Sequence, residues 1–188
     1  MPNIVPPVAD EREGLLKYLA QQRFSFRAVA HGLTEEQASS TPCTSALSIA
    51  GLVKHLAGVE HSWMASVVAQ REPYPSMEEV DWEWQFKLKE GETLAGMLAR
   101  YDEVARQTEA IVAEYPDLGH PVPVPQGVPW FPSDVENWSV RWVLLTLIQE
   151  TARHAGHADI IRETIDGKTM YELIDEHDAH HATAAGNS

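Results

Sequence analysis

The chain contains a single cysteine, Cys43, in 188 residues, so no internal disulfide can form. Disulfides are rare in reducing compartments, and their absence fits a cytoplasmic protein. Cys43 follows Thr41 and Pro42 in a segment of loop composition, without the neighbours that mark a nucleophilic cysteine, and we do not expect it to be catalytic. The N-terminus has neither the basic start nor the apolar stretch of a signal peptide. These absences together predict a cytoplasmic location.

Positive charge is also scarce, because 14 Lys and Arg residues stand against 28 Asp and Glu, for a net charge of −14. Such a surface repels phosphate, which argues against nucleic acids and anionic membranes as partners. No apolar run reaches the roughly 18 uncharged residues that a membrane span needs. We therefore expect a protein that acts on a small-molecule substrate. The sequence leaves open whether it forms a homodimer.

Few segments have the residue pattern of a β-strand, and the sequence contains no internal repeat and no change of composition that would mark a second domain. Apolar residues instead recur at helical spacing in four long segments: 10–31, from Ser45 or Ser48 to 70, 93–115 and 140–164. The last is apolar almost all round, which predicts a central, buried helix. We expect an all-α four-helix bundle with two long crossover connections, 72–92 and 116–138. It forms one domain, 1–175, followed by a flexible tail, 176–188. The prolines of 116–138 exclude a helix there, although a short hairpin is compatible with them.

The last long segment carries three polar side chains at an unusual spacing. Glu150, His154 and His157 lie at positions i, i+4 and i+7 and therefore share one face of the helix. Polar groups on an apolar helix are costly unless a partner such as a metal ion compensates them. On the second helix, His55 lies on the apolar stripe formed with Leu52 and Val59, so it faces the same core.

These residues form a two-His, one-carboxylate set of His55, Glu150 and His154. Three protein ligands leave positions open on the ion, which is typical of a catalytic site. His157 is either a fourth metal ligand or a catalytic acid/base that contacts substrate. We expect one divalent metal ion, zinc first, although these residue types also suit nickel, iron and manganese.

Other histidines and aromatic residues receive different interpretations. We expect His31 to lie in the last turn of the first helix without a metal, and His61 to be solvated. The histidines of the tail are interpreted as a flexible surface cluster: His177, His180 and His181. In the connection 72–92, alternating aromatic residues are expected to pack over the mouth of the helical core and to wall a pocket: Trp82, Trp84 and Phe86.

Two blocks of sequence together resemble a known family. Residues 48–63, with Leu-Val-Lys-His55, and residues 141–163, with Glu150-Thr-Ala-Arg-His154, resemble the second and last bundle helices of the DinB-like superfamily, in particular its DUF664 branch. The similarity covers roughly residues 10–175. It implies a four-helix bundle with a divalent metal on His55, Glu150 and His154. Many members have His at both ligand positions of the last helix; a Glu at the first of these two positions, here Glu150, resembles the mycothiol-dependent maleylpyruvate isomerases. Thr146 departs from the branch, many members of which have His there.

The resemblance also implies a function. Relatives transfer or use low-molecular-weight thiols such as mycothiol and bacillithiol. The expected activity is therefore that of a metal-dependent transferase with a small thiol cosubstrate, acting on a small electrophile in detoxification. A metal ion lowers the pKa of a thiol that it coordinates. Two alternatives stay open at this point. The same open site could activate water in a hydrolase, or the bundle could bind a metal or ligand without turnover.

Overall fold

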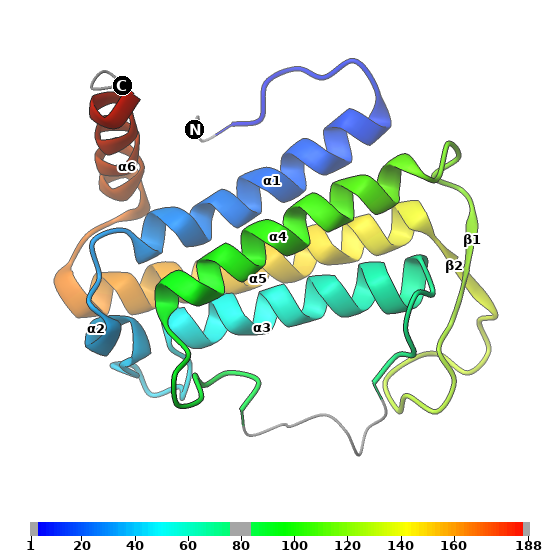
Figure 1. The fold of residues 1–188 in the computed structure, drawn as a ribbon, viewed down its shortest axis with the longest axis horizontal. Coiled ribbons are helices and arrows are strands. Elements are labelled where there is room, and N and C mark those ends of the chain that lie inside the picture. Colours follow the sequence, from blue (N-terminus) through cyan, green and yellow to red (C-terminus); the bar gives the residue numbers. More distant parts are fainter. Residues whose placement is uncertain (1–3, 76–83, 186–188) are drawn as a thin grey trace.

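The computed structural model describes residues 4–75 and 84–185, and it is dominated by helices (Figure 1). The bundle consists of α1 (Glu11–Ala30), α3 (Ile49–His61), α4 (Leu94–Ala113) and α5 (Val140–Asp166). A π-helical segment, η1 (Ser62–Val68), continues α3, and α2 (Glu35–Ser39) is a short turn of helix before it. The predicted all-α bundle of the DinB-like type is confirmed.

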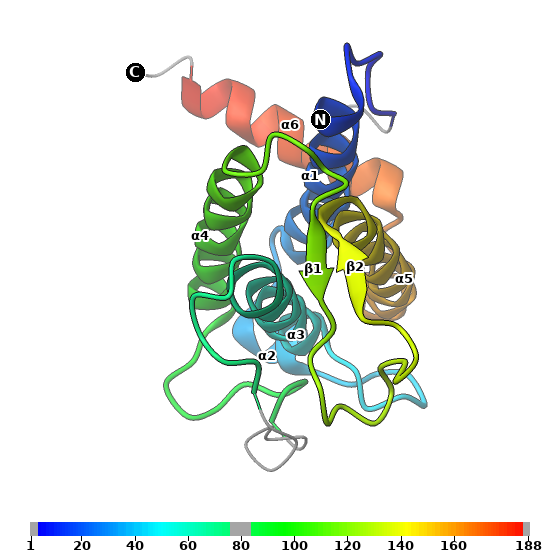
Figure 2. The ribbon, with the colours of Figure 1, turned by 90° about the vertical axis from the view of Figure 1, so that its right-hand side faces the viewer.

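Figure 2 looks along the bundle and shows its four helices at the corners of a square, in the order α4, α1, α5, α3. α1 packs along α5, and α3 packs along α4. α3 and α5 also contact each other, which brings the second helix beside the last one. This pairing decides which side chains can meet in a site.

Each bundle helix begins at a side chain that caps it. Asp10, Ser48, Thr93 and Ser139 each accept a hydrogen bond from the backbone N–H three residues further on. Such a cap satisfies one of the free N–H groups of the first turn. α5 ends at Gly167, whose φ of 77° lies in the left-handed region that favours glycine.

The connection 116–138 contains a hairpin in a minimal form, which its prolines allowed. β1 (Pro121–Pro123) pairs antiparallel with β2 (Asn137–Ser139), with Val122 opposite Trp138. Figure 2 shows this ribbon lying across the end of the bundle at which α5 begins. It leads directly into α5, so it fixes where that helix starts.

A buried charge pair lies inside the bundle. Arg23 of α1 and Glu60 of α3 are each 2% exposed, and their side chains form two hydrogen bonds of 3.0 and 2.5 Å. Thr108 of α4 donates to the same carboxylate at 2.5 Å. Along each of these helices the polar residue falls between the members of two apolar clusters, one toward each end of the bundle. The pair therefore joins three helices at the level where the clusters meet.

The expectation that α5 is buried all round is wrong. Trp142 is 41% exposed, Leu145 50% and Ile160 60%. A bundle helix has neighbours on two sides only, so its outer face meets solvent even when apolar residues occupy it. Burial is concentrated on the face that includes Val143, Leu147 and Ala158.

Beyond α5 the chain turns away from the bundle and forms α6 (Met170–Ala185), which projects at an angle to the other helices (Figures 1 and 2). The sequence predicted a short return segment at 171–175 and a flexible tail from Glu176, whereas the structure continues one helix through both. The domain boundary at 175 stays a prediction. Within the described residues, no helix is long and apolar enough to cross a membrane.

Candidate metal centre

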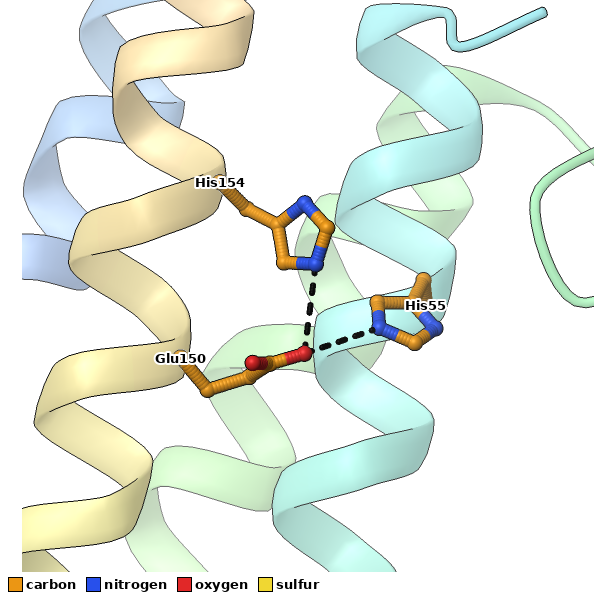
Figure 3. Close-up of side chains that lie close together, drawn as sticks. All are labelled: His55, Glu150 and His154. Atoms are coloured by element: carbon orange, nitrogen blue, oxygen red, sulfur yellow. Dashed lines mark hydrogen bonds and ion pairs between the residues drawn. The ribbon is translucent and has the colours of Figure 1, made fainter.

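The structure brings His55, Glu150 and His154 together between α3 and α5 (Figure 3). Nε2 of His55 lies 3.4 Å from Oε1 of Glu150, and Nε2 of His154 lies 3.2 Å from the same oxygen. One donor atom from each residue lies within 4.8 Å of the other two. In the part of the chain that the structure describes, this is the one group of three such side chains that could hold a metal ion.

The two imidazoles are largely covered, while the carboxylate is open on one side. The side chain of His55 is 10% exposed and that of His154 12%, against 34% for Glu150. Hydrogen bonds from His154 and then from His55 lower the pKa of Glu150, so its carboxylate stays ionised at neutral pH. A negative charge and two imidazole nitrogens therefore converge on one point.

The geometry and chemistry of these donors fit a divalent ion. Donors bound to one tetrahedral ion at about 2.0–2.1 Å lie roughly 3.3 Å apart, close to the separations of Glu150 from each histidine. Two neutral imidazoles and one carboxylate are a common ligand set for zinc and related metals. The same three side chains are also self-consistent without an ion, because each imidazole N–H can donate to the carboxylate.

His157 lies outside the group of three and contacts one of its members, His154. Its Nδ1 is 3.3 Å from Nδ1 of His154, the ring nitrogen of His154 that points away from Glu150. The sequence allowed His157 to be a metal ligand or an acid/base that contacts substrate. In the structure its side chain lies next to a candidate ligand, His154, and not among the three donors. A hydrogen bond between two Nδ1 atoms requires one of them to carry the proton.

Phe86 covers the site from the connection between η1 and α4. Its ring stacks on His55 with centroids 4.1 Å apart and planes 25° from parallel, and its centroid lies 6.1 Å from that of His154. The backbone explains why it can approach. A Cβ at Gly51, one turn before His55, would lie 1.9 Å from the carbonyl oxygen of Phe86. The expectation that Phe86 packs over the helical core is confirmed, whereas Trp82 lies outside the described residues.

Aromatic side chains gather at the other end of the α3–α5 contact. Trp63 lies eight residues after His55 and Trp142 eight residues before Glu150, which is about 12 Å along each helix. Their ring centroids are 5.8 Å apart, and Trp142 stacks on Trp138 at 4.6 Å. Phe131 packs against Trp63 at 5.5 Å. The connection 116–138 therefore contributes Phe131 and Trp138 to an aromatic cluster about two helical turns from the donor set.

The remaining histidines of the sequence analysis lie elsewhere. The side chain of His61 is 34% exposed and its Nε2 lies 2.8 Å from a carboxylate oxygen of Glu72, so it is half-buried rather than fully solvated. His31 and His177 contact each other with ring centroids 6.0 Å apart, beside Phe24. His180 and His181 belong to α6, but their side chains are not among those that the structure describes.

Comparison with known proteins gives a family for the chain and a solved structure with the same fold. A family model described as Mycothiol-S-transferase matches residues 14–167. A crystal structure titled as the conserved protein of locus from Enterococcus faecalis has the same fold, with a TM-score of 0.64 and 13% identity. The similarity covers 86% of this chain and all of that one. No curated protein matches the sequence.

Proposed function

The chain belongs to the mycothiol-S-transferase family, and from this premise we propose a metal-dependent transferase that joins a low-molecular-weight thiol of the mycothiol type to a small electrophile. The observation that supports the metal is the convergence of His55, Glu150 and His154 on one point. The family supports the thiol. Detoxification is the role that such a reaction would serve.

His55, Glu150 and His154 are the residues that would hold the ion. Bound there, a divalent ion lowers the pKa of a coordinated thiol and so provides a thiolate at neutral pH. The chain itself holds the donors in place before any ion binds, because both helices are fixed by the bundle. Phe86 excludes water from the face of His55, which strengthens electrostatic interactions at the site.

His157 acts in this proposal as a positioning residue for His154. If Nε2 of His154 held the ion, the proton of this imidazole would stay on Nδ1, and that N–H would donate to Nδ1 of His157. Such contacts fix the tautomer and the orientation of a ligating imidazole, and their loss typically lowers metal affinity about 10–100-fold.

The metal is tested first, by elemental analysis of the purified protein and of variants. We expect about one divalent ion per chain, zinc before nickel, iron or manganese, and its loss in His55→Ala and His154→Ala. His61→Ala, on the same helix as His55, is the matched control and should keep the ion. Full occupancy in both ligand variants would show that the site is misplaced.

The role of His157 needs a separate pair of variants. His157→Leu removes the acceptor for His154 and should weaken zinc binding about 10–100-fold in a chelator competition. His157→Asn keeps an acceptor oxygen near the position of Nδ1 and should stay within a few-fold of the natural chain. Equal weakening by both variants, or by neither, would contradict the positioning role.

The reaction class is tested by the requirement for thiol. Turnover of monochlorobimane or a chloronitroarene is measured with mycothiol, and again without it. Product that appears only with thiol supports the transferase. Consumption of the electrophile without thiol, with water as the nucleophile, indicates the hydrolase instead. A chain that binds zinc but converts none of these compounds under either condition would favour a non-catalytic bundle.

A further inference from the structure

A cavity of about 340 Å³ lies between α1, α5 and α6, away from the metal centre. Its walls include the polar side chains Gln22, Ser25 and Asp159 and the apolar side chains Phe24, Met170 and Ile174. None of the candidate metal ligands is among the residues that line it. The volume falls within the range of small-molecule sites, about 300–1,000 Å³.

Asp159 is the one charged residue in this wall. Its Oδ1 atom is buried and has no hydrogen-bond partner within residues 4–75 and 84–185. Burial, and to a smaller degree the nearby charge of Glu163, raises the pKa of Asp159 to about 6. A partly buried carboxylate without a partner is costly, and the usual compensation is a positive charge or a hydrogen-bond donor.

Among the described residues, no basic side chain pairs with Oδ1 of Asp159. Arg162, one turn further on α5, is already engaged by Asp166 at 2.8 Å and by the carbonyl oxygens of Val29 and His31 at 2.6 and 2.8 Å. The cavity beside Asp159 is thus a place where a cation from solution meets an unpaired carboxylate. The net charge of −14 favours the approach of cations in general.

We propose that this cavity binds a small organic ammonium compound. Its charged nitrogen would pair with the Asp159 carboxylate, with the Gln22 amide and the Ser25 hydroxyl as further hydrogen-bonding groups. Its apolar part would pack against Phe24, Met170 and Ile174. The ligand would then bridge α6 to the bundle, because α1 and α5 supply one side of the wall and α6 the other. This proposal does not depend on the metal or on the transferase activity.

The test compares two probes of nearly equal shape by calorimetry and by NMR chemical-shift mapping: phenethylammonium and the neutral phenethyl alcohol. The natural chain should bind the ammonium at least about tenfold more tightly, with shifts confined to the facing parts of α1, α5 and α6. Asp159→Asn, which keeps the shape, should bind both probes alike. Glu163→Gln, one turn away and outside the cavity wall, should keep the preference.

A second readout follows from the bridge between α6 and the bundle. Saturating phenethylammonium should slow proteolytic cleavage within 167–185 in the natural chain and leave it unchanged in Asp159→Asn. The proposal fails if the natural chain does not distinguish the two probes, if Asp159→Asn keeps the preference, or if the ammonium shows no saturable binding below about 10 mM. The comparison of the two probes on the natural chain decides this even if the variant does not fold.

Discussion

Replacing Arg23 by alanine removes one half of the charge pair inside the bundle and leaves Glu60 without its cation. Both side chains are 2% exposed, so water cannot take the place of the missing partner. Breaking a buried pair in this way costs about 3–5 kcal/mol. Because the free energy of unfolding of a typical domain is about 5–15 kcal/mol, this single change should remove a large share of the stability.

The loss converts to a melting-point shift that is easy to measure. For a domain of this size, 1 kcal/mol corresponds to roughly 2–4 °C, so Arg23→Ala should lower Tm by about 6–20 °C. Urea denaturation gives the free energy directly. The control is Arg71→Ala, which breaks the pair with Glu114; those side chains are 52% and 54% exposed, and such exposed pairs contribute about 0–1 kcal/mol.

A double variant separates the pair from its surroundings. Arg23→Met combined with Glu60→Leu removes both charges and keeps apolar volume, so it should recover much of the stability that Arg23→Ala loses. Thr108 then loses its acceptor, which limits the recovery. If Arg23→Ala costs no more than Arg71→Ala, the carboxylate of Glu60 is not isolated from water and the reasoning is refuted.

Two further predictions concern Gly51 and Asp159. Gly51→Ala forces a Cβ against the Phe86 carbonyl, so it should destabilise the protein and speed hydrogen exchange in 84–92. The control is Gly58→Ala on the same helix, where nothing lies within 4 Å of the added Cβ; it should stabilise the protein by about 0.5–1 kcal/mol. Equal effects of the two substitutions would disprove the contact. The pKa of Asp159 is raised from 3.8 to about 6, so its contribution to stability is present below the lower value and is lost as pH rises through the higher one. Asp159→Asn does not titrate, so the Tm of the variant minus the Tm of the natural chain should rise between about pH 4 and pH 6.5 and level off at higher pH; a difference that stays constant with pH would contradict the raised pKa.

The sequence predicted the fold and the donor set because both follow from helical periodicity. Glu150 and His154 are one turn apart, and His55 lies on the apolar stripe of its own helix, so a bundle brings all three inward once α3 and α5 are neighbours. The neighbourhood itself came from the resemblance to the DinB-like superfamily, since periodicity alone does not order the helices of a bundle.

What the sequence did not reveal depends on contacts between distant segments. Arg23 and Glu60 are 37 positions apart, and a charged residue on an amphipathic helix is normally interpreted as solvated. Gly51 resembles any helical glycine until the carbonyl of Phe86 is placed against it. The cavity at Asp159 depends on α6, a helix that a polar, alanine-rich composition did not predict.

The uneven covering of the candidate metal centre has a consequence for how a cosubstrate would enter. Phe86 closes the side of His55, so the open approach is past Glu150, the most exposed of the three donors. Since Glu150 stays ionised, it would offset only part of the charge of a bound divalent ion, and the two imidazoles, neutral as ligands, would offset none of it. The open side of a filled site would therefore be net positive and would attract an anionic group such as a thiolate. Metal binding would thus reverse the sign of the charge that an incoming molecule meets at this entrance.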